Sequence, residues 1–173
     1  MKFERFSIYG FSVDYPVDWK VELNNKSERI KGHVAFKGPE RDVIFVSWGP
    51  LEEARKSYCS PHEQAKASLS NIRKIGIKNV ELIEAKSVKV NLHEASFNHV
   101  RVIRSRHAMS LSSKDNLQEE IRSLHLHCES SKRFFVIYGA SPPDKSSKYA
   151  NIFENMLKSF RCCTVRRRQE NDA

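Results

Sequence analysis

The stretch YANIFENMLKSF, from Tyr149 to Phe160, decides the fold. Its large apolar side chains recur at intervals of three and four residues; they are Tyr149, Ile152, Phe153, Met156, Leu157 and Phe160. This spacing is typical of an amphipathic helix with one buried face. The preceding Ser141-Pro142-Pro143-Asp144 breaks the segment before it and opens the helix. The sequence therefore predicts a closing helix whose apolar face is sealed against an earlier part of the chain.

The segments before this helix alternate apolar and polar residues, as half-buried strands do. We expect four long strands, at 87–92, about 94–106, about 119–129 and 134–139, with a turn at Ser130-Ser131-Lys132 between the last two. Further upstream, the sequence predicts two short strands, at 33–37 and 43–48, joined by a charged turn. A first strand begins at Phe11, and Pro16 ends or bends it.

One further helix is expected, because Ser60, Pro61 and Glu63 form a capping box with proline at the first helical position. Gly76 would end this helix. Strands come in runs, and few of them are separated by a helix, which favours an antiparallel sheet over a parallel one. We therefore predict an α+β fold: a curved antiparallel sheet of about six strands with helices packed on it. Residues 1–163 form a single domain, and 164–173 a flexible basic tail.

The order of segments resembles a known superfamily. The early GFSVDYPVDWKV, from Gly10 to Val21, contains Tyr15-Pro16-x-x-Trp19, and the final helix ends in Leu-Lys-Ser-Phe-Arg at 157–161. This resembles the PsbP-like superfamily, which also includes the Ran guanine-nucleotide release factor and small bacterial lipoproteins. The resemblance covers nearly the whole chain and implies a PsbP-like sandwich. It also implies a non-enzymatic domain that docks to a larger assembly, and it carries over no binding residue.

Composition favours an anionic partner. The 173 residues carry 30 Lys and Arg against 21 Asp and Glu, a net charge of +9. Such a surplus attracts acidic protein surfaces and nucleic acids alike. No apolar run reaches the roughly 18 residues that a membrane span needs, and the N-terminus does not read as a signal peptide. We expect a cytoplasmic protein.

Arginines gather on the middle strands, and we predict that Arg104, Arg106, Arg122 and Arg133 form a partner-binding surface on an exposed, partly basic sheet face. The alternative is a solvated face on which these arginines pair with nearby glutamates. The leading hypothesis is a non-enzymatic binding or adaptor domain that docks an acidic protein or macromolecular assembly. The second is a nucleic-acid or ribosome-associated protein that binds an RNA or DNA backbone non-specifically, with the tail residues Arg166, Arg167 and Arg168 contributing.

Motifs for chemistry are absent: the chain has no phosphate-binding loop, no HExxH and no GxSxG. We expect no catalytic residue, cofactor or metal. His125 and His127 share one strand face while Cys128 points to the other, so only two ligands are local, and His93, His99 or His107 would have to complete a site. Two surface imidazoles are the simpler interpretation.

Two further expectations concern the cysteines and tryptophans. Cys59 and His62 flank a helix start, where a thiol can be activated, but the capping box already explains this segment. The four cysteines suit reduced thiols. Trp19 and Trp48 are expected in or at the edge of the core, because tryptophan is usually largely buried.

Overall fold

The computed structural model describes residues 1–40, 42–74, 79–104 and 117–163. Nine strands and three α-helices occur within these ranges. The strands are β1 (Phe3–Ile8), β2 (Phe11–Pro16), β3 (Lys20–Leu23), β4 (Gly32–Lys37), β5 (Val43–Pro50), β6 (Asn79–Val90), β7 (His93–Arg104), β8 (Leu117–Cys128) and β9 (Arg133–Ser141). The helices are α1 (Leu51–Arg55), α2 (Pro61–Lys74) and α3 (Ser146–Ser159), with a short 3₁₀ turn, η1 (Pro143–Lys145), before α3.

The predicted α+β architecture is confirmed. Seven strands form one antiparallel sheet in the order β3-β4-β5-β9-β8-β7-β6, and β1 pairs with β2 in a separate hairpin. About six strands were expected; the predicted segments lacked β3 of the large sheet and β1 of the hairpin, and the strand at 87–92 was predicted to start too late. β6 starts at Asn79, and its outer surface is largely solvent-exposed, so its first half lacks the clear alternation that marks a half-buried strand.

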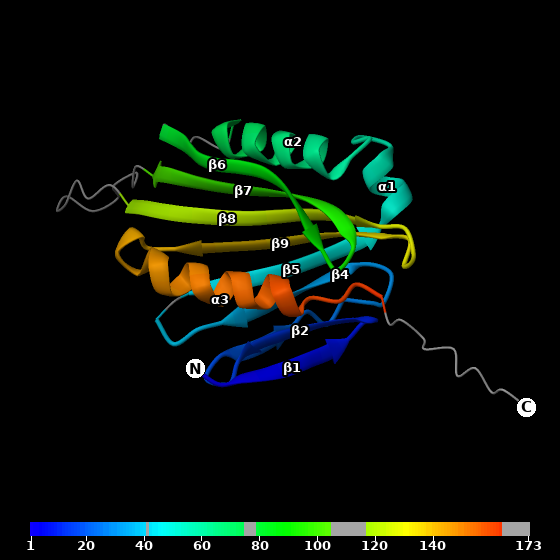
Figure 1. Cartoon of the computed structure of the whole chain (residues 1–173), viewed down its shortest axis with the longest axis horizontal. Coiled ribbons are helices and arrows are strands. Elements are labelled where there is room, and N and C mark those ends of the chain that lie inside the picture. The colour runs from blue at the N-terminus through cyan, green and yellow to red at the C-terminus, as the bar shows by residue number, and fades with distance from the viewer. Residues whose placement is uncertain (41, 75–78, 105–116, 164–173) are drawn as a thin grey trace, which may run out of the picture.

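The closing helix packs as predicted. In Figure 1, α3 lies across one face of the large sheet, and the β1–β2 hairpin lies beside it on the same side. The helix, the hairpin and the sheet enclose one aromatic core, in which Phe160 lies 5.8 Å from Phe11 and 5.2 Å from Phe135, measured between ring centroids. Tyr149, Ile152, Phe153 and Met156 of α3 are buried in this core. The expected positions of Trp19 and Trp48 are also confirmed, since both are buried.

The opposite face of the sheet is covered by α2. Leu69 and Ile72 of this helix pack on a smaller core made of Val100, Val102 and Ile121. The predicted capping box is present: Ser60 Oγ accepts a hydrogen bond from Glu63 N, and the Glu63 carboxylate accepts one from Cys59 N. Gly76, the expected end of the helix, lies outside the described residues. With helices on both faces, most of the sheet surface is covered.

Two glycines make this packing possible. Tyr9 and Gly10 both have positive φ angles, 58° and 73°, which is the geometry of a tight two-residue hairpin turn and suits glycine. At Gly139, a Cβ atom would lie only 1.7 Å from the Tyr149 hydroxyl oxygen. That hydroxyl donates to the carbonyl of Val43 at 2.7 Å. Gly139 therefore lets α3 approach the centre of the sheet.

Candidate functional site

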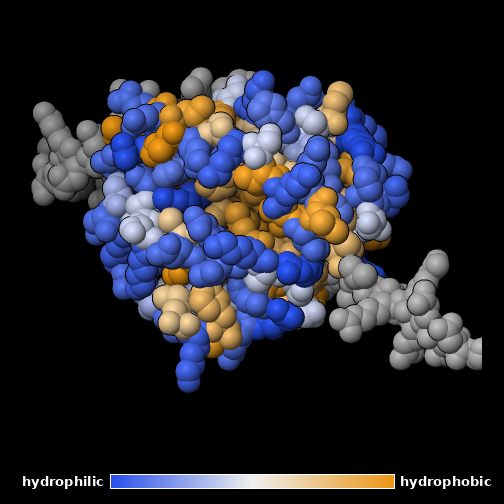
Figure 2. Space-filling model, viewed as in Figure 1, coloured by the Kyte–Doolittle hydropathy of each residue, from blue (hydrophilic) through white to orange (hydrophobic). Residues whose placement is uncertain are grey.

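A groove of about 560 Å³ lies between α3 and two strands, β6 at the edge of the sheet and its neighbour β7. Its apolar lining residues are Val88, Val90, Phe97 and Leu157. Charged side chains form its rim: Glu84, Lys86 and Lys89 from β6, and Glu154 and Lys158 from α3. Figure 2 shows apolar surface in a hollow near the middle of this face, framed by hydrophilic side chains. The arrangement is that of a binding groove, apolar inside and charged outside.

β6 supplies one wall of the groove. Side chains of β6 alternate, so that Glu84, Lys86, Val88 and Val90 point toward α3. Lys86 Nζ lies 5.3 Å from the centroid of the Phe97 ring on the neighbouring strand, a cation–π distance. Lys86 also pairs with Glu84 at 2.7 Å, and Lys158 pairs with Glu154 at 3.7 Å.

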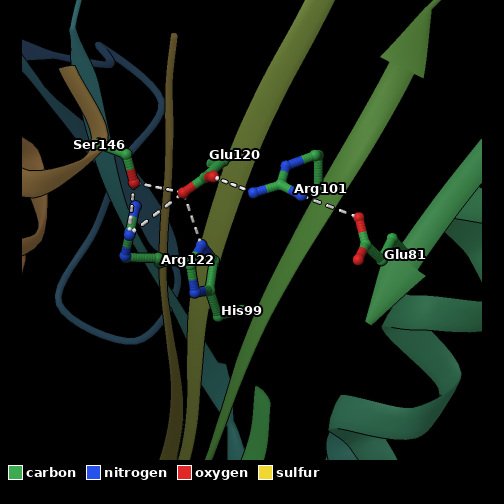
Figure 3. A network of polar contacts seen from close by, with 6 residues as sticks. All are labelled: Glu81, His99, Arg101, Glu120, Arg122 and Ser146. Atoms are coloured by element: carbon green, nitrogen blue, oxygen red, sulfur yellow. Dashed lines mark hydrogen bonds and ion pairs between the residues drawn. The ribbon is translucent and has the colours of Figure 1, made fainter. Parts of the chain in front are cut away.

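A polar network centred on Glu120 (Figure 3) reaches the groove through His99 and Arg122, which are among the lining residues. Glu120 accepts a hydrogen bond from Arg101 Nη2 at 3.0 Å and one from Arg122 Nη2 at 3.4 Å, and His99 Nε2 lies 2.9 Å from its Oε2 atom. The hydroxyl of Ser146, at the start of α3, also donates to Glu120 and accepts from Arg122 at 2.7 Å. The network thus joins β7 and β8 to the last helix.

The carboxylate at the centre of this network is held in its charged form. Burial alone would raise the pKa of Glu120, but hydrogen bonds from Ser146, Arg101 and His99 outweigh it and lower the pKa to about 2. Arg122 is 7% exposed, and its Nη1 atom has no hydrogen-bond partner among the described residues. This guanidinium donor is therefore both buried and unpaired.

The predicted arginine surface is placed differently from our expectation. Arg122 and Arg133 are both buried, because α3 and the N-terminal hairpin cover the face of the sheet to which they point. They also lie at opposite ends of the β8–β9 pair, since Arg122 is opposite Gly139 and Arg133 is opposite Cys128. Of Arg104 only the backbone is described, at the end of β7, and Arg106 lies outside the described residues together with Arg166, Arg167 and Arg168.

The expectation of two surface imidazoles was wrong for His125. α2 covers its strand face, and the side chain is 1% exposed. Burial, with a smaller effect of His127, lowers the pKa of His125 to about 4, so the ring is neutral. Neither ring nitrogen has a partner among the described residues. His127 is half-buried and lies 3.0 Å from Gln64 of α2.

A second cluster contains metal-ligand chemistry. Cys128 points away from His125 and His127, as predicted, and meets His93, Cys162 and Cys163. The four donor atoms all lie within 4.8 Å of one another. Sequence reasoning did not group these residues, because they come from three distant parts of the chain. The one available signal was a pair of consecutive cysteines directly after an apolar helix.

Comparison with known proteins shows the fold. No protein-family model matches the chain, and no curated protein sequence matches it significantly. Among solved structures, cyanobacterial PsbP (CyanoP) from Synechocystis sp. PCC 6803 has a TM-score of 0.64 at 12% identity, covering 92% of this chain and 91% of that one. The Ran-binding protein Mog1p of Saccharomyces cerevisiae has a TM-score of 0.61 at 10% identity, covering 95% and 97%.

These likenesses define the class of fold: it is PsbP-like, as the sequence resemblance implied. A protein from Bacteroides thetaiotaomicron shares it at a TM-score of 0.52 and 14% identity, covering 93% of this chain and 48% of that one. No helix among the described residues is both long and apolar enough to cross a membrane.

Proposed function

We propose that this chain is a non-catalytic protein-binding domain that docks an acidic, partly apolar segment of a partner protein in the groove between α3 and β6–β7. The observation that carries the proposal is the groove itself, with its apolar lining and a rim that carries three lysines and two glutamates. Apolar side chains of the partner would bury against Phe97 and Leu157, while acidic ones would meet the positive charges.

The charges of the groove favour an acidic partner. Lys86 and Lys158 already pair with glutamates, but no ion pair between described residues involves Lys89. Arg122 lines the groove, but its Nη1 atom is buried and its Nη2 atom is bonded to Glu120 and Ser146, so the rim lysines are the cations within reach of a partner. The net charge of +9 would speed the encounter with an acidic surface. Arg104, the last residue of β7, shares the strand parity of Val100 and Val102, which pack on the α2 side, so we leave Arg104 and Arg106 out of this groove.

The Glu120 network supports a binding role over catalysis. Its carboxylate is saturated by four donors, and such saturation lowers its pKa to about 2, far below the range that general acid–base catalysis uses at neutral pH. The network therefore suits a rigid support for Arg122. The likeness to a Ran-binding protein, although it shows the fold alone, agrees with this role.

An NMR titration tests the proposal. The ¹⁵N-labelled protein would receive two synthetic peptides of equal length, one alternating Glu with Leu and one alternating Lys with Leu. We expect the acidic peptide to shift the backbone signals of Val88, Phe97 and Leu157. Reversing two rim charges, Lys86→Glu with Lys158→Glu, should weaken its binding by about tenfold. The matched control, Lys26→Glu with Lys31→Glu, changes the net charge equally on the exposed loop between β3 and β4.

Equal loss of binding in both double variants would reduce the effect to net charge and contradict the groove. Signal changes confined to other surfaces would do the same. An RNA oligonucleotide serves as the third probe. If RNA binds more tightly than the acidic peptide, weakens steeply with salt and ignores the groove variants, the nucleic-acid alternative is favoured, and Arg166, Arg167 and Arg168 become the first residues to replace.

A further inference from the structure

Four side chains with metal-binding atoms converge beside the end of α3. His93 is the first residue of β7, Cys128 is the last residue of β8, and Cys162 and Cys163 follow α3. His93 Nε2 lies 3.7 Å from the sulfur of Cys128 and 3.9 Å from that of Cys163. We propose that these four residues bind one zinc ion through three thiolates and an imidazole.

The distances suit a tetrahedral zinc site. With zinc–sulfur bonds of about 2.3 Å, a regular tetrahedron has edges of about 3.8 Å. The two His93–sulfur distances are close to that edge, and the limit of 4.8 Å on all the donor pairs leaves only a small contraction for an entering ion. Thiolates and imidazole are the ligands that zinc prefers in four-coordinate structural sites.

The backbone is arranged to bring the donors together. Consecutive residues of an extended chain point in opposite directions, yet the sulfurs of Cys162 and Cys163 both face this cluster, because the chain bends at these two residues. Antiparallel bonds between Ser12 and Arg161, of 2.8 and 2.9 Å, hold the segment just before the bend against β2. Three segments far apart in sequence therefore present their ligands to one point.

Surrounding groups fit an anionic metal centre. The backbone N–H of Ser131 donates to the Cys128 sulfur at 3.4 Å, a contact that stabilises a thiolate. Arg133 lies opposite Cys128 in the β8–β9 pair and donates to the carbonyl of Cys162 at 3.3 Å. Its guanidinium is buried, and no ion pair between described residues involves it. Zn²⁺ with three thiolates carries one negative charge, which would balance this buried cation.

The ligand set defines a structural role. Four protein ligands leave no open position for water or substrate, so the ion would fix the segment after α3 to the sheet. A cavity of about 440 Å³, lined by Arg29, Lys132, Cys162 and Cys163 among others, offers an entry path. From sequence we expected no metal site; the proposal differs because the structure joins Cys128 to residues that lie far from it along the chain.

Zinc content tests the proposal directly. The protein would be purified under reducing conditions without chelators, and zinc would be counted by mass spectrometry of the element. We expect one zinc per chain in the wild type. His93→Asn and Cys128→Ser should each weaken zinc binding by at least about 100-fold in a chelator competition. Two matched controls, His62→Asn and Cys59→Ser, change the same residue types outside the cluster and should keep the full zinc content.

Cobalt provides an independent measurement. Co²⁺ added to the metal-free protein should give the intense visible absorption of a tetrahedral thiolate site, and the two cluster variants should lose it. A folded, fully reduced wild type that binds Zn²⁺ no more tightly than the His93→Asn and Cys128→Ser variants would overturn the proposal. So would a thiol titration that finds Cys128 and Cys162 joined in a disulfide while the protein excludes zinc. The wild-type measurements decide the question even if a cysteine variant fails to fold.

Discussion

Two buried arginines, one near each end of α3, show two ways of keeping a cation inside this fold. Arg122, near the start of the helix, lies beside the carboxylate of Glu120 and the hydroxyl of Ser146. Arg133, near the end of the helix, forms no ion pair with a described residue. It donates instead to the carbonyls of Tyr9 at 2.6 Å, Gly10 and Arg29 at 2.8 Å and Cys162 at 3.3 Å.

The difference lies in how the buried charge is compensated. Arg122 is neutralised by the carboxylate of Glu120, and its Nη1 atom stays buried without a partner among the described residues. Arg133 donates hydrogen bonds to the hairpin turn, the loop before β4 and the segment after α3. Each of its terminal nitrogens makes two of these bonds, so neither is left for a partner. Because a buried charge must be balanced or strongly hydrogen-bonded, these two side chains meet the same demand with different consequences.

The largest expected effect comes from removing the carboxylate of Glu120 beside Arg122. Glu120→Ala leaves Arg122 buried without its counter-charge, and we expect the free energy of unfolding to fall by about 4 kcal/mol. Urea denaturation would measure it. Glu81→Ala is the matched control, because Glu81 pairs with Arg101 in the same network at 3.0 Å but is largely exposed. It should cost less than about 1 kcal/mol. Similar losses from both variants would remove the central role of Glu120.

The surroundings of Arg133 are tested by Arg133→Met, which keeps much of the side-chain volume and removes every hydrogen bond to the four carbonyls. We expect a loss of about 3 kcal/mol in unfolding free energy, because the orphaned carbonyls remain buried. Lys132→Ala, on the exposed neighbouring turn residue, should change stability by less than about 0.5 kcal/mol. A stable Arg133→Met protein with an unchanged denaturation midpoint would contradict the structural role.

Acid should reduce the stability that the Glu120 network contributes, within a defined pH window. The pKa of Glu120 is about 2 in the folded chain against 4.5 unfolded, so the unfolded state binds more protons between these values. Its contribution, about 3 kcal/mol, is complete above pH 4.5 and is lost as the pH falls toward 2. His125, with a folded pKa of about 4 against 6.5, destabilises the fold in the same direction between pH 6.5 and 4.

Denaturation midpoints across pH 2–7 separate the two windows. Glu120→Gln should remove the pH dependence of the midpoint only between pH 4.5 and 2. His125→Leu should remove it only between pH 6.5 and 4, since a leucine cannot take up a proton in the unfolded state. If the lower window persists in Glu120→Gln, another carboxylate is responsible and the assignment to Glu120 fails.

The smallest expected effect concerns the link between the network and α3. Ser146→Ala removes the hydroxyl that joins Glu120 to Arg122, and we expect a loss of about 1.5 kcal/mol in unfolding free energy. Ser147→Ala, on the next residue of the helix, is the control. Equal melting temperatures for the two variants would show that the start of α3 does not depend on the network.

Local sequence patterns predicted the elements that have a clear apolar signal. The spacing of Tyr149 to Phe160 placed α3, because one face of this helix is buried, and two short apolar segments joined by turn-forming residues placed β4 and β5. β1 was missed: its side chains are mostly exposed, with Phe6 the buried exception, so the segment lacks a clear apolar face.

Side-chain parity was predictable, but coverage was not. Alternation showed that Cys128 points away from His125, and it could not show which helix covers each face. For that reason His125, Arg122 and Arg133 were expected at the surface, although all three are buried. The grouping of His93 with Cys128 and the consecutive cysteines depends on strand register and on the bend after α3, which a linear pattern does not encode.

The position of Phe160 has a consequence for the order of assembly. This ring fills the gap between Phe11, which is synthesised long before it, and Phe135 in the middle of the large sheet. Until the ribosome has released the chain beyond that point, the hairpin and the sheet lack a shared partner and expose aromatic surface. Such long-range closure slows folding, so the growing polypeptide would need shielding, and any truncation before residue 149 would leave a product prone to aggregate.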